Sequence, residues 1–284
     1  HNEFLFGYSN LKHRIDREIF FHRTGFDVTY LLNNNYIYVR HRIHEAHYVL
    51  TYPLTEVLAL KGTATIQYDK PYVLAYDDIS AKRSMDGNVW GIAKGELVYD
   101  NTRELGTNLM LGLRFKFFGE YYQLANKASI NMITAGFDIR NYTRIHRSFI
   151  WANRFAAGTS FGKNKLLYYM GGVDNWLNPS FNSEYQIYDK QNYAFQTLAT
   201  SMRGFKQNVR SGNTFALFSS ELRLPVFRYL LNKPLKSEFL NNFQVVGFTD
   251  IGSAWQGLNP LTEENTYYTK TVSSEPLEIT VKVQ

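Results

Sequence analysis

The chain has 284 residues, and its 31 lysine and arginine residues against 25 aspartate and glutamate residues give a formal net charge of +6. The basic residues are scattered rather than clustered, which argues against a nucleic-acid-binding protein. The chain has no cysteine, and this excludes disulfide bonds, thiol catalysis and cysteine-based metal sites.

Segments of alternating polarity follow one another along the chain. Several are about 9 to 12 residues long, which is the length of a tilted membrane-spanning strand, whereas strands of soluble sheets have about 5 or 6 residues. Strands are predicted near residues 2–8, 13–32, 36–51, 56–69, 88–99, 108–122, 129–142, 149–162, 213–227, 243–255 and 277–284. Short connections at 52–56, 99–106 and 142–148 and long polar ones at 70–87, 163–212 and 256–276 are typical of outer-membrane barrels. No helical domain is predicted.

The segment 109–117, "LMLGLRFKF", shows the alternation clearly. Its odd-numbered residues are all apolar, and its even-numbered residues include Arg114 and Lys116. A soluble β-sandwich also alternates, but its dry core would not accept full charges in mid-strand, whereas a water-filled lumen would. We therefore predict an all-β fold, an antiparallel up-and-down transmembrane β-barrel, in which Leu111 and Phe115 face lipid.

Two short motifs lie near the end of the chain. The long loop 163–212 contains Met202-Arg203-Gly204-Phe205, and a later strand contains Phe248-Thr249-Asp250-Ile251-Gly252. Together with "ELRLP" at 221–225, they resemble the bacterial surface antigen superfamily, which includes BamA-type outer-membrane assembly factors and two-partner-secretion transporters. In that family a V-R-G-F/Y loop folds into the lumen, and its arginine contacts the acidic residue of an F-x-D-x-G strand. Here methionine stands in the place of the usual valine.

The resemblance implies a barrel of roughly sixteen strands in the outer membrane of a Gram-negative bacterium. Other stretches, such as "YMGGVDNWL", resemble barrels of Bacteroidota-type bacteria that are fused to a β-propeller. We expect residues 1–284 to be a single barrel domain with about eleven of these strands, the closing strands and any periplasmic module lying outside the chain. The expected site residues are the loop motif Met202, Arg203, Gly204 and Phe205, the strand motif Phe248, Asp250 and Gly252, and the neighbouring lumenal charges Glu221 and Arg223.

The residues themselves favour a latch between Arg203 and Asp250. Alternation within 243–255 places Asp250 on the non-lipid face, together with Phe248 and Gly252. The loop is long enough to bring Arg203 to this face, where guanidinium and carboxylate can form a bidentate pair. Gly204 allows the loop to turn, and Gly252 leaves room beside the carboxylate. A solvated loop arginine and an unrelated strand aspartate are the alternative.

Two other patterns suggest chemistry that the context does not support. Residues 158–162 match the G-x-S-x-G motif, but that motif requires a helix after Ser160, and none is predicted here. His41, His44 and His47 are close in sequence, but on a strand His44 points away from the other two. We therefore predict no catalytic residue, no metal site and no cofactor, and the chain is not expected to be an enzyme.

Three functions are open. The barrel could insert or translocate polypeptides, it could be a plugged anchor for a soluble propeller or peptidase-like module, or it could be an enzyme with an active site at its rim. The expected partners are outer-membrane lipid and, for the first function, polypeptide clients and accessory outer-membrane or periplasmic proteins; nucleic acid is not expected. We also expect the 163–212 loop and the 99–106 connection at opposite rims, so that labelling of intact cells reaches a cysteine at Asn182 but not one at Thr102.

Overall fold

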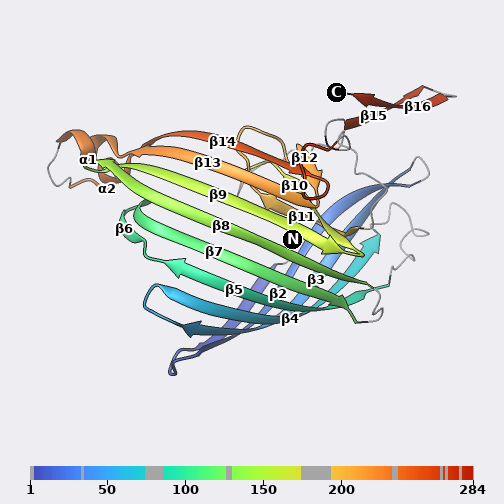
Figure 1. Cartoon of the computed structure of the whole chain (residues 1–284), viewed down its shortest axis with the longest axis horizontal. Coiled ribbons are helices and arrows are strands. Elements are labelled where there is room, and N and C mark those ends of the chain that lie inside the picture. Colours follow the sequence, from blue (N-terminus) through green and yellow to red (C-terminus); the bar gives the residue numbers. More distant parts are fainter. Residues whose placement is uncertain are drawn as a thin grey trace. The chain divides into compact units, whose positions relative to one another are not determined.

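The computed structural model describes residues 3–32, 35–73, 86–125, 130–173, 193–231, 236–262, 265, 268–274 and 277–283. Nearly all of its elements are strands (Figure 1). They are β1 (Phe4–Asn10), β2 (Asp16–Leu32), β3 (Asn35–Pro53), β4 (Leu58–Val73), β5 (Asn88–Asp100), β6 (Arg103–Gly106), β7 (Leu109–Leu124), β8 (Asn131–His146), β9 (Phe149–Gly162), β10 (Lys165–Met170), β11 (Tyr193–Thr200), β12 (Arg210–Gly212), β13 (Thr214–Leu224), α1 (Val226–Leu231), α2 (Glu238–Asn242), β14 (Val245–Trp255), β15 (Tyr268–Ser274) and β16 (Leu277–Val283).

Most strands belong to one sheet in the order β1-β2-β3-β4-β5-β7-β8-β9-β13-β14, with β6 paired to β7 beside this path. The pairings among β1 to β4, and those of β13 with β9 and β14, are antiparallel and have no register shift. Neighbours in this order are also neighbours along the chain, except that β6 lies between β5 and β7, and that β10, β11 and β12 lie between β9 and β13 as a small sheet of their own. The predicted antiparallel, up-and-down arrangement is confirmed. The hairpin β15–β16 is a separate two-stranded sheet.

The chain divides into two compact units, His1–Leu97 with Gly119–Ile133, and Val98–Phe118 with Thr134–Gln284. In the first unit, β2, β3 and β4 have two faces of different polarity. Ile19, Leu60 and Ile66 are exposed on one face, and Thr65 and Gln67 are buried on the other. The single domain expected over residues 1–284 stays a prediction.

The second unit separates charge from apolar surface in the same way. Every charged residue of β9, β13 and β14 lies on one face, which we call the charged face; these residues are Arg154, Glu221, Arg223 and Asp250. Asp138 of β8 joins this face because its carboxylate binds Arg154. The residues alternate strictly along the paired strands, so the separation follows directly from period 2.

The opposite face of these strands, the apolar face, carries large exposed side chains. Phe155, Phe218 and Ile251 are register partners across β9, β13 and β14, and their exposed fractions are 44%, 43% and 65%. One row of uncharged polar residues, Asn153, Ser220 and Thr249, crosses this face. The neighbouring Trp151 donates a hydrogen bond from Nε1 to Ser220 Oγ at 2.8 Å. The face therefore presents apolar area to its surroundings instead of burying it in a core.

Aromatic rings extend the apolar face to β7. The ring centroids of Phe115 and Phe117 are 5.4 Å apart, those of Phe117 and Phe137 are 6.0 Å apart, and those of Phe137 and Phe155 are 5.2 Å apart. Phe115 thus lies on the apolar face, as predicted, whereas Leu111, expected on the same face, packs against the buried cluster of Leu109, Ile150 and Ala152.

Leu109, at the start of the same strand, departs from this alternation. It is buried against Ile150 and Ala152, which share the face of Arg154. The change occurs around Gly112, whose φ of +115° is rarely adopted by other residues. Such a backbone conformation interrupts the regular strand, so period 2 cannot be extended through it.

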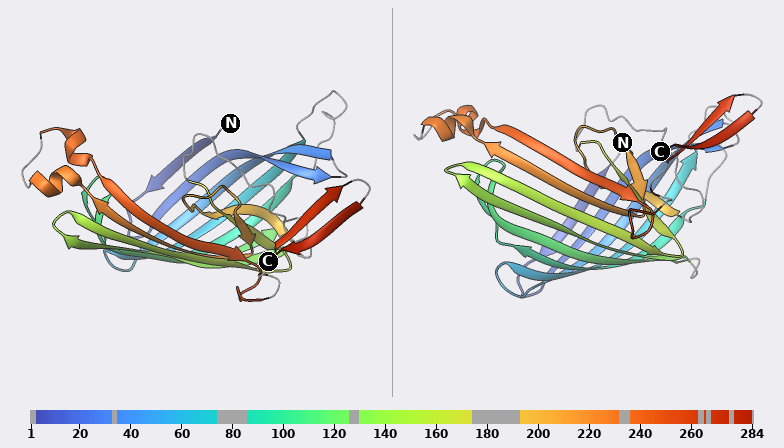
Figure 2. Two further views of the ribbon diagram at one scale, coloured as in Figure 1. Left: turned by 90° about the horizontal axis from the view of Figure 1, so that it is seen from above. Right: turned by 45° about the horizontal axis from the view of Figure 1, so that its top comes forward.

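The small sheet β11-β10-β12 lies against the charged face of β9, β13 and β14, as both views of Figure 2 show. Met170 of β10 and Leu217 of β13 are almost fully buried in this contact. The Tyr168 and Phe215 rings meet edge to face with centroids 5.0 Å apart. The described parts of the long 163–212 loop, which the sequence predicted only as a long polar connection, therefore contain three short strands ordered by packing.

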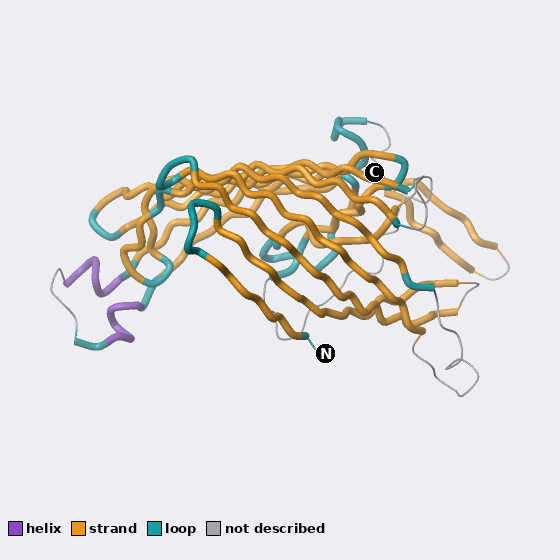
Figure 3. The backbone as a smooth tube through the Cα atoms, turned by 90° about the horizontal axis from the view of Figure 1, so that it is seen from below, coloured by secondary structure: helices purple, strands orange, loops and turns teal. Residues whose placement is uncertain are grey.

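The structure also contains two short helices that the sequence analysis did not predict. The strand predicted over 213–227 ends at Leu224, and α1 begins at Val226. The second helix begins after Ser237, whose side chain accepts a hydrogen bond from the Leu240 backbone N–H at 3.5 Å. Helices of six and five residues are too short to show a helical period. Figure 3 shows them extending beyond the strands.

The ends of the strands in the second unit place α1 beside the 99–106 connection. Arg228 donates a hydrogen bond to the Leu105 carbonyl oxygen at 2.9 Å, and the Tyr229 hydroxyl lies 2.9 Å from His146 Nδ1 at the end of β8. The 163–212 loop joins the opposite ends of β9 and β13. The described parts of the two connections therefore lie at opposite rims of this unit, as predicted. Asn182 lies outside the described residues, and the labelling of intact cells stays a prediction. No helix within the described ranges is long and apolar enough to span a membrane.

Candidate functional site

Arg203 reaches the charged face because its loop makes a tight turn there. Met202 is buried and forms a β-bridge with Gly172. The Gly172 backbone N–H donates to the Phe205 carbonyl oxygen at 2.9 Å, which closes the turn, and Gly204 at its tip adopts a φ of +86° that glycine accepts without strain. The Phe205 ring is exposed. Of the loop motif, Met202 and Gly204 thus serve the backbone path, and Arg203 makes the contacts.

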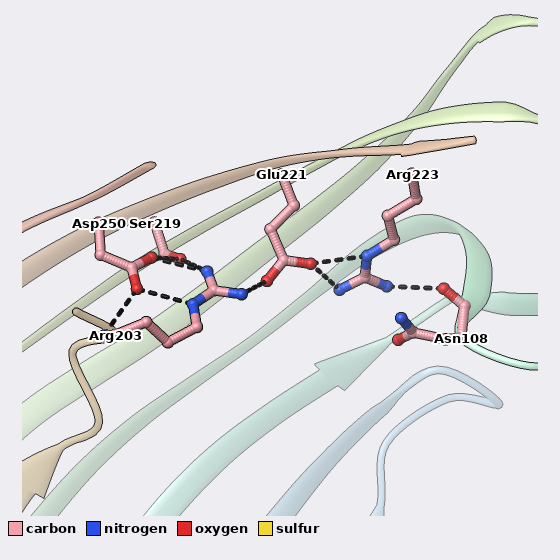
Figure 4. Close-up of polar contacts among 6 residues, drawn as sticks. All are labelled: Asn108, Arg203, Ser219, Glu221, Arg223 and Asp250. Atoms are coloured by element: carbon pink, nitrogen blue, oxygen red, sulfur yellow. Dashed lines mark hydrogen bonds and ion pairs between the residues drawn. The ribbon is translucent and has the colours of Figure 1, made fainter. Parts of the chain in front are cut away.

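The guanidinium of Arg203 forms a bidentate pair with Asp250 (Figure 4). Its Nε donates to Asp250 Oδ2 at 2.8 Å, and its Nη2 donates to Asp250 Oδ1 at 2.7 Å. The Arg203 backbone N–H donates to Asp250 Oδ2 as well, at 3.0 Å. The aspartate side chain is only 3% exposed, so this contact is largely shielded from water. Charge-assisted pairs of this geometry are among the stronger polar contacts in proteins.

A second carboxylate binds the remaining arm of the guanidinium. Arg203 Nη1 donates to Glu221 Oε1 at 2.5 Å, and Nη2 also donates to Ser219 Oγ at 3.0 Å. The Ser219 hydroxyl in turn donates to Asp250 Oδ1. Because Ser219 and Asp250 are register partners on β13 and β14, a single arginine from the loop fastens two adjacent strands.

Arg223 continues the polar network toward the far rim. Its Nε and Nη2 bind Glu221 Oε2 at 2.7 Å and 2.6 Å, and its Nη1 donates to the Asn108 carbonyl oxygen at 2.8 Å. Figure 4 shows the line of contacts from Asp250 through Arg203, Glu221 and Arg223 to Asn108. Each charge has a partner of opposite sign or a carbonyl group, as shielded ions require.

Phe248 and Gly252 shape the floor of this site. The Arg203 guanidinium carbon lies 3.9 Å from the Phe248 ring centroid, which is a cation–π contact. At Gly252 a Cβ atom would come within 2.8 Å of Met170 Cε and 2.9 Å of the Ala216 carbonyl oxygen. The strand motif therefore supplies a ring beneath the cation, a carboxylate, and a gap into which the small sheet packs.

Arg203 is held as a cation by these partners. Hydrogen bonds to the Asp250 carboxylate, with a further contribution from Glu221, raise the pKa of its guanidinium above the ordinary value. Arginine is protonated at every physiological pH in any case. The latch therefore does not switch with the protonation of its arginine.

A second ion pair, between β8 and β9, also binds the loop through a hydrogen bond. Arg154 binds Asp138 Oδ2 through Nη2 at 2.7 Å and through Nε at 3.0 Å, and its Nη1 donates to Thr200 Oγ1 at 3.0 Å. Arg140 binds the same carboxylate, with Nε 2.8 Å from Asp138 Oδ1. The loop is thus bound directly to β9, β13 and β14, and Asp138 of β8 binds the same Arg154.

The structure brings Met202, Arg203, Phe248, Asp250, Gly252, Glu221 and Arg223 into one neighbourhood. The sequence did not indicate Ser219 or Thr200, and it placed Arg154 among the lumenal charges without assigning it a partner. Ser219 could have been found from its pairing opposite Asp250 if the register had been known. Thr200 precedes the motif by two residues and carries no signal of its own.

The G-x-S-x-G match around Ser160 and the histidines at 41, 44 and 47 do not form a catalytic or metal site among the described residues. Ser160 is fully buried, and its hydroxyl accepts a hydrogen bond from the Leu166 backbone N–H at 2.8 Å. His47 Nδ1 lies 2.7 Å from Thr65 Oγ1, and the position of the His41 side chain lies outside the described residues. In the part of the chain that the structure describes, no group of three or more His, Asp or Glu side chains is placed to hold a metal ion.

Comparison with known proteins gives a likeness of fold. No protein-family model and no curated protein matches the sequence. Among solved structures, the chain is similar to BamA from Haemophilus ducreyi, in a crystal structure that lacks POTRA domains 1–3, with a TM-score of 0.54 and 11% sequence identity. The match covers 99% of this chain and 58% of that chain, so our sequence spans less than two thirds of its length. The fold is therefore that of an incomplete, antiparallel β-barrel of the BamA type.

Proposed function

We propose that the chain is part of an outer-membrane β-barrel whose apolar face contacts lipid and whose charged face lines the lumen. The observation that carries this proposal is the segregation of charge. All charged residues of β9, β13 and β14 lie on one face, whereas Phe155, Phe218 and Ile251 are exposed on the other. Such an exposed apolar surface is unfavourable in water and suits a bilayer. The BamA-like fold supports the same location.

Lipid contact can be tested by depth-dependent quenching. The chain has no cysteine, so Phe218→Cys introduces a single position for a fluorescent label. In vesicles with brominated acyl chains, we expect strong quenching at Phe218→Cys and little at Lys206→Cys, an exposed position of the loop. Equal quenching at both positions would contradict the assignment of the two faces.

The finer proposal is that the barrel inserts or translocates polypeptides and that the Arg203–Asp250 latch holds the loop in its working position. The resemblance of both motifs to the surface antigen superfamily, and the contacts of Arg203 with β13 and β14, support this role. The clients would be polypeptides, and accessory outer-membrane or periplasmic proteins would deliver them.

Polypeptide handling can be measured as accelerated folding of a client barrel. Vesicles containing the full-length protein are mixed with a small, urea-unfolded outer-membrane barrel, and folding is followed by its heat-resistant migration on gels. We expect the client to fold faster than in empty vesicles. The acceleration should be lost in Arg203→Ala and kept in the control variant Lys206→Ala. An equal rate in empty and loaded vesicles would contradict this function.

A plugged anchor is the second candidate, and one observation favours it. The small sheet β11-β10-β12 packs on the charged face through buried residues such as Met170, which would fill part of the lumen. An anchor of this type predicts low ion conductance in planar bilayers and no effect on client folding. Conductance together with the folding assay therefore separates the two functions.

A further inference from the structure

The helices α1 and α2 form a small apolar surface at one rim of the second unit. The Phe227 and Phe243 rings are 5.5 Å apart, and the Phe239 and Phe243 rings are 5.8 Å apart, so the aromatic contacts join the two helices. Leu230 and Phe239 are 68% and 71% exposed. Neither helix has a buried residue. The apolar side chains are therefore gathered together but not covered by any described part of the chain.

The helices are amphipathic, and their polar side is fixed to the strands. Phe227, Leu230 and Leu231 are spaced i, i+3 and i+4, so they share one side of α1. Arg228 and Tyr229 lie on the other side, and they bind the Leu105 carbonyl oxygen and His146. These two contacts orient α1, with its apolar side turned away from the 99–106 connection.

The helices are joined to strand ends that belong to the apolar face of the sheet. Leu224 and Val245 are register partners at the last rung between β13 and β14, and both belong to that face. The first helix starts two residues after Leu224, and Phe243 lies two residues before Val245. Both helices thus lie within a few residues, along the chain, of the surface that we assign to lipid.

The net charge of this rim is positive, which favours contact with anionic lipid headgroups. Basic residues outnumber acidic residues among the described parts of 100–108, 142–148 and 226–243. The basic residues are Arg103, Arg144, Arg147, Arg228 and Lys236, and the acidic residues are Asp100, Glu104 and Glu238. Aromatic and basic side chains together are typical of the boundary between acyl chains and anionic headgroups.

We propose that α1 and α2 form an interfacial anchor, which inserts Leu230, Leu231 and Phe239 into the headgroup boundary of the leaflet at this rim. Short amphipathic segments bind a membrane surface through buried apolar area together with attraction to anionic lipid. The anchor would hold the rim at a fixed depth and limit the tilt of β13 and β14. This inference rests on the proposed outer-membrane location, since the rim must lie at a bilayer.

Spin labels at single cysteines test the anchor in the full-length protein, reconstituted in phosphatidylethanolamine and phosphatidylglycerol vesicles. Collision with oxygen reports lipid, and collision with a water-soluble nickel chelate reports water. We expect oxygen to dominate at Phe239→Cys and Leu230→Cys, and the nickel chelate to dominate at Asn241→Cys, which lies on the opposite side of α2 and is exposed. Ile251→Cys on the apolar face of β14 is the reference for lipid contact.

The outcomes separate this inference from the location on which it rests. Nickel accessibility at Phe239 and Leu230 with oxygen accessibility at Ile251 would overturn the anchor and leave the membrane location standing. An immobilised label that neither reagent reaches at Phe239 would mean that a protein covers the helices, a second copy or a partner, and would also overturn it. Nickel accessibility at Ile251 would overturn the membrane location itself. Agreement between the labels on α1 and α2 guards against a local effect of one substitution.

Discussion

Replacing Arg203 with alanine removes the loop's main contact with β13 and β14. The guanidinium donates hydrogen bonds to Asp250, Glu221 and Ser219 and lies over the Phe248 ring. After the substitution, Asp250 keeps the donors of Ser219 and of the backbone N–H of residue 203, which does not depend on the side chain. Two carboxylates on adjacent strands then lack their shared cation.

The magnitude follows from how well each group is shielded. Removal of one partner of a fully buried ion pair costs about 3–5 kcal/mol of unfolding free energy. Here the Arg203 side chain is 26% exposed and Glu221 retains Arg223, so solvent and the remaining cation reduce the loss. We expect Arg203→Ala to lower the unfolding free energy by about 2–3 kcal/mol, because hydrogen bonds to charged groups contribute about 1.5–3 kcal/mol each and part of the network survives.

The assay is reversible urea unfolding of the protein in lipid vesicles, with Arg203→Ala, Asp250→Ala and the double variant compared in a double-mutant cycle. We expect the double variant to be little less stable than either single variant, with a coupling energy of about 2 kcal/mol, because both substitutions remove the same contact. Lys206→Ala is the matched control, since it removes an exposed cation of the same loop. Its stability should be close to that of the parent.

Strict additivity in the cycle would refute the reasoning, because it would mean that Arg203 and Asp250 do not share their energy. Arg203→Lys provides a further check on geometry. Lysine keeps the charge but lacks the planar fork that reaches Asp250 and Glu221 at once. We expect it to lose more than half of the stability that alanine loses.

Three further predictions follow from the fold. Gly252→Ala should destabilise the protein by about 1–3 kcal/mol through overpacking against the small sheet, whereas Gly247→Ala on the same strand, where a Cβ would meet nothing within 4 Å, should not; urea unfolding compares the two. Phe218→Arg should cost about 2–4 kcal/mol in vesicles, as a charge on a lipid-facing surface does, and a value near zero would argue against lipid contact. A membrane-impermeant maleimide added to intact cells should label Lys163→Cys but not Thr107→Cys, because these exposed positions lie at opposite rims; labelling of both would contradict the topology.

The sequence predicted the parts of this structure that depend on period 2. The separation of Asp250 from Ile251 and of Arg154 from Phe155 follows from alternation alone, so strand identity and face could be assigned. The alternation failed at Leu109, which is buried and precedes Gly112 with its positive φ, so its side chain and that of Phe115 lie on different faces. No feature of residue type at positions 109–111 announces this difference.

The latch could be anticipated as a pair but not as a network. A motif resemblance and the parity of β14 pointed to Arg203 and Asp250. The contribution of Ser219 depends on the register between β13 and β14, and that of Thr200 depends on how the loop folds back, and neither is encoded locally. The small sheet and the two helices are short elements stabilised by packing, so local propensity gave no usable signal for them.

The contact of Arg203 with two strands at once also has a consequence for folding. A slip of β14 by one residue against β13 would preserve most of the backbone ladder but would carry Asp250 to the other face. Arg203 could then reach Glu221 but not both carboxylates. The full set of Arg203 contacts can therefore form only in the native register of β13 and β14. Closure of the loop would then stabilise this register over one that is shifted by a single residue.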